Sequence, residues 1–106
     1  MPTYLLQGSY TSEGAKGLAK DGGTKRRAAV KEMVEKSGGS VKAFYFALGE
    51  SDVYTIVELP DTATAVAMSL AVNSSGSVNL KTVALLSPEE FDAAVKKSVG
   101  YRPPGA

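Results

Sequence analysis

The chain contains neither histidine nor cysteine among its 106 residues. Without imidazole or thiol groups it has no Ser-His-Asp or Cys-His catalysis, and no zinc, copper or haem ligand of the usual kind. Any chemistry must come from the hydroxyl, amine, guanidinium, amide and carboxylate groups that remain, or from a cofactor. We therefore expect no metal site, and we expect no cofactor.

The chain also lacks a charge excess and any long apolar run. Lys and Arg number 12 against 11 Asp and Glu, which argues against nucleic acid as a partner. No apolar run reaches the roughly 20 residues that span a bilayer, and Met1-Pro2-Thr3-Tyr4 lacks a signal-peptide pattern. The length is that of one ordinary domain. We expect a single cytoplasmic domain over residues 1–106, without a membrane partner.

Four β-branched and aromatic runs predict strands, over residues 3–10, 41–48, 52–59 and 78–86. Gly49-Glu50-Ser51 separates the second run from the third, which indicates a hairpin with a short loop. Pro60 ends the third run, because proline cannot donate to a strand ladder.

Helices are predicted between these strands. Thr11-Ser12 can cap a first helix, which the pair Gly22-Gly23 should break or kink. Thr24 can cap its continuation, and Lys25–Lys36 has the spacing of an amphipathic helix. Asp61 can cap another helix that runs to about residue 72.

The C-terminal part carries the clearest helix start of the chain. Ser87-Pro88-Glu89-Glu90 is a capping box with proline in the first turn, and the helix is expected to run to about Val99. The tail from Gly100 cannot be helical, because its prolines remove donors. We expect Tyr101–Pro104 to lie against a neighbouring surface, since an extended proline segment loses little entropy on docking.

The resulting order, β-α-β-β-α-β followed by a helix, predicts an α+β ferredoxin-like fold with one antiparallel sheet. In such a two-layer fold the face away from the helices should be polar if the protein works alone. Here both faces of Phe44–Leu48 and Val53–Leu59 are apolar. A homodimer or higher even oligomer, burying sheet against sheet, would hide them. Alternatively, the last helix or the tail covers the second face.

Five segments of the chain are distinctive when taken together: Gly8-Ser9-Tyr10-Thr11, Gly22-Gly23-Thr24-Lys25-Arg26-Arg27, Ala43-Phe44-Tyr45-Phe46-Ala47, Gly49-Glu50-Ser51-Asp52 and Val99-Gly100-Tyr101-Arg102-Pro103-Pro104. They resemble the GYD-domain family, and the resemblance runs essentially from end to end. It implies a dimeric α+β barrel and brings no agreed reaction or catalytic residue. The loop of the predicted hairpin has Ser51 where the family typically has an aromatic residue.

The candidate ligand site lies beside the glycine break. A new helix start there, with Lys25 and Arg26, suits a carboxylate, carbonyl or phosphate group, and Tyr10 ends the first strand nearby. Tyr45 and Tyr54 are further candidates, because strand phase alone does not show which face they occupy. The alternatives are a solvated basic helix face and tyrosines that fill the core.

Three classes of function remain open. The first is binding of a small organic molecule, aromatic or carrying an acidic or carbonyl group, by a dimeric barrel. The second is a cofactor-independent oxygenase or isomerase, in which lysine or tyrosine would replace the missing histidine. The third is an oligomeric scaffold without a ligand. A partly polar cavity would favour the first two classes, and a fully packed interior would favour the third.

Overall fold

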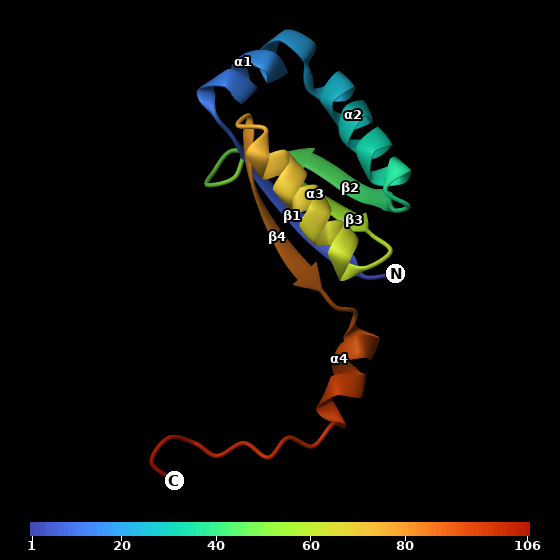
Figure 1. Cartoon of the computed structure of the whole chain (residues 1–106), viewed down its shortest axis with the longest axis vertical. Helices are drawn as coiled ribbons and strands as arrows, with labels where there is room; N and C mark the ends of the chain where they lie inside the picture. The colour runs from blue at the N-terminus through green and yellow to red at the C-terminus, as the bar shows by residue number, and fades with distance from the viewer.

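A computed structural model describes all 106 residues, as one sheet with helices on one side and a last helix that leaves it (Figure 1). The strand order is β2-β3-β1-β4, and every neighbouring pair is antiparallel. The predicted ferredoxin-like α+β fold is confirmed. The elements are β1 (Thr3–Tyr10), α1 (Ser12–Asp21), α2 (Gly23–Lys36), β2 (Ser40–Phe46), β3 (Val53–Glu58), α3 (Thr62–Ser74), β4 (Val78–Leu85) and α4 (Pro88–Val95).

Three of the helices begin at the capping residues that the sequence predicts. The Thr11 hydroxyl accepts a hydrogen bond from the N–H of Gly14 at the start of α1. Asp61 caps α3, and Ser87 caps α4 within a full capping box. These side chains satisfy backbone donors that the first turn of a helix leaves without partners.

The exception is α2, which begins directly after the glycine break. Gly22 has a φ of 82°, a left-handed conformation that glycine adopts without strain, and Gly23 is already helical. The prediction that Thr24 caps this helix is therefore wrong. The predicted break itself is confirmed, and it turns the chain so that α2 lies back over the sheet (Figure 1).

The core fills the space between the sheet and the helices α2 and α3. Its three fully buried large side chains are Val34 of α2, Val57 of β3 and Leu59. The buried hydroxyl of Thr55 donates a hydrogen bond of 2.7 Å to the carbonyl oxygen of Ala43 on the neighbouring strand. Because this buried hydroxyl has a hydrogen-bond partner on the neighbouring strand, its burial destabilises the core little.

Strand β2 contains an irregularity that the sequence does not reveal. Val41 pairs with Val57 and Ala43 pairs with Ile56, so the register shifts at Lys42. Because of this bulge, Val41 packs against the core, whereas strict alternation places it on the same face as Ala43.

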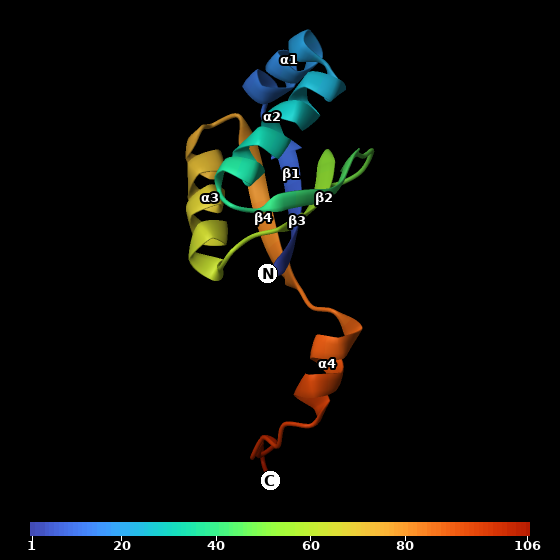
Figure 2. The same cartoon turned by 90° about the vertical axis from the view of Figure 1, so that its right-hand side faces the viewer.

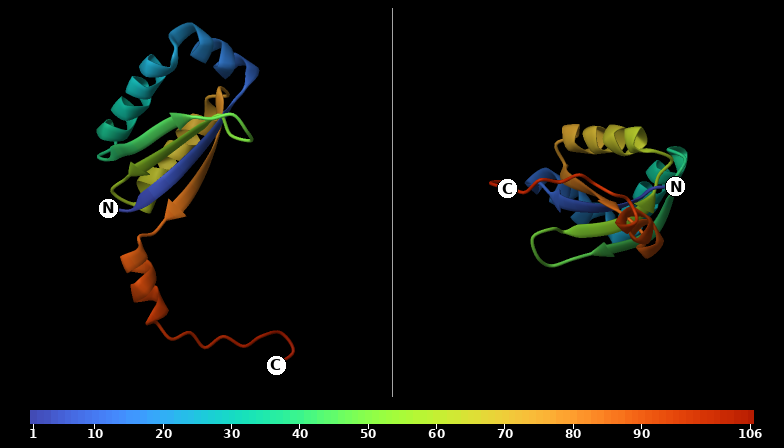
Figure 3. Two further views of the ribbon diagram at one scale, coloured as in Figure 1. Left: turned by 180° about the vertical axis from the view of Figure 1, so that it is seen from behind. Right: turned by 90° about the horizontal axis from the view of Figure 1, so that it is seen from below.

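The sheet face away from α2 and α3, here called the open face, is not covered by any other part of the chain. Helix α4 continues past the end of β4 and none of its residues is buried (Figure 2). It ends at Val95, earlier than expected, and residues 96–106 are exposed. The left view of Figure 3 looks onto the open face, and the last helix lies far below it. Helix α4 therefore does not cover this face, and that alternative is wrong.

Candidate functional site

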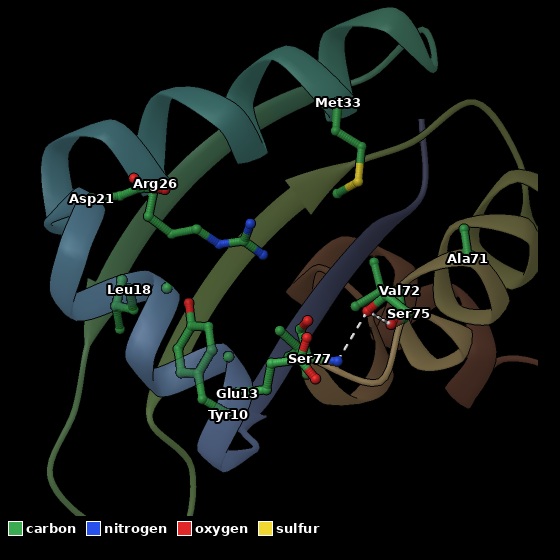
Figure 4. A pocket seen from close by; sticks show the side chains of 13 residues that line it. Tyr10, Glu13, Leu18, Asp21, Arg26, Met33, Ala71, Val72, Ser75 and Ser77 are labelled. Carbon is green, nitrogen blue, oxygen red and sulfur yellow. Dashed lines mark hydrogen bonds between the residues drawn. The ribbon is translucent and has the colours of Figure 1, made fainter.

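A cleft of about 670 Å³ lies where the end of β1, the helices α1 and α2, and the turn from α3 to β4 meet (Figure 4). Helix α1 contributes Glu13 and four further residues, Gly14, Gly17, Leu18 and Asp21, whose spacing of three and four residues places them on one helix face. Two of these four are glycines. The space is open partly because this face of α1 carries so few side chains.

The start of α1 is fixed to β4 by close backbone contact. The Thr11 N–H donates to the carbonyl oxygen of Ser77 at 3.0 Å. A Cβ atom added at Gly14 would lie 2.0 Å from that same oxygen, so only glycine fits there. At Gly17, by contrast, an added Cβ would meet nothing within 4 Å. One end of α1 is therefore anchored, and its middle lies free above the cleft.

Tyr10 is the last residue of β1, and the neighbouring hairpin holds it in place. Its backbone N–H donates to the carboxylate of Asp52 at 2.9 Å, and the Asp52 N–H donates to the carbonyl oxygen of Gly8 at 2.8 Å. Asp52 is thus a turn residue, as its position in the sequence suggests. The contact fixes the end of β1, from which the Tyr10 side chain enters the cleft.

Arg26 reaches into the cleft from α2, toward Tyr10 (Figure 4). Its guanidinium carbon lies 6.0 Å from the centroid of the Tyr10 ring. Its Nε is buried and has no hydrogen-bond partner, and the side chain makes no ion pair. A buried donor without an acceptor is uncommon in folded proteins and marks the most unusual group of the cleft.

Lys25 does not join this group. Its side chain is 74% exposed, and its Nζ lies 3.5 Å from Asp21 Oδ1 in an i,i+4 pair. Such an exposed pair contributes little to stability, but it places a positive charge beside Asp21. Glu13 is the second carboxylate that lines the cleft, and it makes no ion pair.

Tyr45 and Tyr54 lie on the opposite side of the sheet. They are direct cross-strand partners of β2 and β3, and Tyr45 is 71% exposed. The residues next to Tyr54, Val53 and Thr55, are the ones buried under the helices. The structure therefore brings Tyr10 and Arg26 together, places Lys25 at the outside of the same region, and separates the other two tyrosines from it.

The apolar side of the cleft comes from residues of two predicted helices and of the last predicted strand. Met33 of α2, Val72 of α3 and Val78 of β4 line the cleft, together with an inner void of about 40 Å³ that adjoins it. Tyr10 and Arg26 line both spaces. The glycine pattern of α1 is the sequence signal that could have shown where the helix layer stays open.

The arrangement offers a cation, a phenol and an apolar wall. No group of three Asp or Glu residues lies close enough to hold a metal ion. No helix is both long and apolar enough to cross a membrane. The hydrogen-bond donors of the cleft suit a ligand with an acceptor group, and the inner wall of the cleft suits a ligand with an apolar body.

A family model described as the GYD domain matches residues 4–95. The chain belongs to the GYD-domain family. The resemblance seen in the sequence is thus confirmed from β1 to the end of α4, a range that contains the whole cleft. In comparisons with curated proteins and with solved structures, nothing matches this GYD-domain chain.

Proposed function

We propose that this GYD-domain protein binds a small organic acid in the cleft, with Arg26 as the partner of the acidic group. One observation carries the proposal: the buried Nε of Arg26 has no acceptor. Leaving such a donor unsatisfied costs about 1–3 kcal/mol. A ligand carboxylate would supply the missing acceptor, and guanidinium groups bind carboxylates with two parallel hydrogen bonds.

The rest of the ligand is expected to be apolar. Met33, Val72 and Val78 form the inner wall beyond Arg26, and the cleft has the volume of ordinary small-molecule sites, roughly 300–1,000 Å³. The Tyr10 hydroxyl can donate a second hydrogen bond. Because Glu13 lines the cleft without a cation beside it, a second acidic group on the ligand would be repelled. A monocarboxylate with an aromatic or aliphatic body fits these walls best.

Benzoate is a suitable probe of this proposal. In a titration followed by amide chemical shifts, benzoate should perturb residues near Tyr10 and Arg26 and leave the open face at Tyr45 and Tyr54 unaffected. Arg26→Ala should weaken binding by roughly 10- to 100-fold, the loss expected for a charged hydrogen bond of about 1.5–3 kcal/mol. Arg27→Ala, next in the chain and exposed, is the matched control.

Equal benzoate affinity of the two arginine variants would contradict the proposal, and so would perturbations confined to the open face near Tyr45 and Tyr54. The scaffold alternative has less support, since it would suit a fully packed interior. An enzyme of the oxygenase or isomerase type would additionally need a proton acceptor at the ligand, and Glu13 is the cleft carboxylate without an ion pair.

The proposed assembly is a homodimer that buries the open face. The cross-strand register aligns Ala43, Ile56, Leu5 and Val83 in one line across all four strands, here called the apolar row. A second line, the polar row, is parallel to it on the same face. It consists of Tyr45, Tyr54, Gln7 and Lys81.

The two rows of one copy are complementary to the same rows of a second copy in one of two symmetric orientations. A two-fold axis parallel to the strands brings β2 opposite β4 of the second copy, so that Ala43 meets Val83 and Tyr45 meets Lys81. At each edge the small Ala43 then lies opposite the larger Val83, Ile56 lies opposite Leu5 in the middle, and a lysine lies over an aromatic ring. An axis across the strands would instead place Ala43 on Ala43 and leave Lys81 without an aromatic partner. The first orientation is the one that we propose.

Light scattering tests the dimer, and the expected mass is twice 11.0 kDa. Val83→Lys places a charge in the apolar row at a position that is 41% exposed in one copy, so the single copy can tolerate it. Because the interface is symmetric, each copy contributes one lysine to it, and the variant should be monomeric. Ala63→Lys, on the exposed side of α3, is the control and should remain dimeric. A dimeric Val83→Lys variant would show that the open face is not the interface.

A further inference from the structure

We infer that the C-terminal arm, Leu86–Ala106, packs against the second copy, so that each copy is held by the arm of the other. The inference rests on the dimer proposed above. Helix α4 lies beyond the end of the sheet and, in Figure 2, on the side away from α3. None of its residues is buried, yet the GYD-domain match extends to its last residue. The helix belongs to the domain but has no surface of its own chain to cover.

An isolated helix of this length is not stable in water. Helix α4 has eight residues, whereas isolated helices shorter than about 12–15 residues are marginal. Its capping box contributes on the order of 1 kcal/mol, so the rest must come from packing. Phe91 and Val95 are one turn apart and are 60% and 68% exposed. They provide the apolar side on which such packing would occur.

The open face is a small surface for an interface. Its four strands are six to eight residues long at roughly 3.3 Å per residue and lie about 4.8 Å apart, so the face covers ~450 Å² in plan. A stable interface of standard size buries about 1,600 Å² of accessible surface in total, and a pair of arms, one from each copy, adds apolar surface to that total. The arms are continuous with the proposed interface, because each follows directly from β4.

The register of the dimer predicts where the arm lies. Strands β4 and β2 run in opposite directions, so the end of β4 at Leu85 meets the start of β2 at Ser40 in the second copy. Only two residues separate Leu85 from α4. The first turn of α4, with Glu89, follows within four residues and therefore comes closest to Ser40, at the start of β2 in that copy. Lys42 lies further inside the strand and already pairs with Glu58 of its own chain at 3.8 Å.

The same contact cannot form within one chain. Strands β2 and β4 are the two edges of the sheet, with two strands between them, and are therefore about 14 Å apart. The absence of cysteine from the chain makes this difference easy to test. One chain carries only Glu89→Cys, and a co-expressed chain of different mass carries only Ser40→Cys. We expect a short bismaleimide to link these two chains to each other.

Two crosslinking controls accompany this pair. Chains that both carry Glu89→Cys should not crosslink, since the two-fold axis places the arms at opposite edges. Lys20→Cys, exposed on α1 and distant from the arm, should not crosslink to Glu89→Cys either. If the Glu89→Cys and Ser40→Cys chains give no more product than these controls, the placement of the arm is wrong.

Dilution experiments on the full chain measure what the arm contributes. Phe91→Glu combined with Val95→Glu should raise the dimer dissociation constant at least tenfold, and Lys97→Glu, on the same arm, should leave it unchanged. An unchanged constant for the double variant would overturn the inference while the open-face dimer stands. A wild-type chain that is monomeric in light scattering would refute the dimer itself, and the inference with it. A loss of thermal stability that is independent of concentration would show that the arm packs on its own chain.

Discussion

Replacing Arg26 by methionine should make the ligand-free protein more stable. The substitution removes a buried Nε that lacks a partner, a group whose desolvation costs about 1–3 kcal/mol. It also removes the contact of the guanidinium with the Tyr10 ring at 6.0 Å, which contributes roughly 0.5–1 kcal/mol. Methionine has a similar length and suits the apolar wall at Met33 and Val72. The net gain is therefore about 1 kcal/mol.

Thermal unfolding followed by circular dichroism measures this gain. For a domain of this size, 1 kcal/mol corresponds to a rise in Tm of roughly 4 °C. Arg27→Met is the control and should change stability by less than about 0.5 kcal/mol, because its side chain is exposed. Protein concentrations must be equal, since association shifts Tm. An Arg26→Met variant less stable than the wild type would refute the reasoning, because the Nε would then have a partner in the free protein.

Three further predictions concern other parts of the fold. Gly17→Ala should stabilise the protein by up to about 1 kcal/mol in thermal unfolding and keep benzoate binding, whereas Gly17→Phe should fill the cleft and abolish binding in the same titration. Hydrogen bonds from Thr64 hold the pKa of Asp61 below its usual 3.8, so the carboxylate stabilises α3 above that pH and the effect is lost as the pH falls below it. The Tm difference between wild type and Asp61→Ala should accordingly be full at neutral pH and shrink in acid. Leu59→Ala should cost about 2–5 kcal/mol in chemical denaturation, since the side chain is fully buried.

The sequence predicts most of the fold because local signals agree with it. Capping residues at Thr11, Asp61 and Ser87 mark three helix starts, and runs of β-branched and aromatic residues identify the strands. The end of α4 is predicted less well. The helical pattern continues toward Val99, but a helix without a packing surface ends early, at Val95.

The site could be predicted only in part, because it depends on register and on the angle between helices. The break at Gly22 is visible in the sequence, and it is what turns Arg26 toward Tyr10. The face of Tyr45 depends on the bulge at Lys42, which is a property of strand pairing rather than of local residue type. A one-residue shift in register changes the face of every side chain. For this reason the sequence alone does not show on which face of the sheet Tyr45 and Tyr54 lie.

The two proposed activities share the strands of the sheet and occupy its opposite faces. Alternate residues of β1 serve each side: Leu5 and Gln7 lie in the rows of the open face, while Leu6 and Tyr10 face the cleft and its inner void. Because neighbouring residues point in opposite directions, a substitution in the apolar row changes no side chain of the cleft. Association and ligand binding should therefore be separable by single substitutions. A monomeric Val83→Lys variant that still binds benzoate with wild-type affinity would establish this, whereas a coupled loss would mean that the dimer holds the cleft in shape.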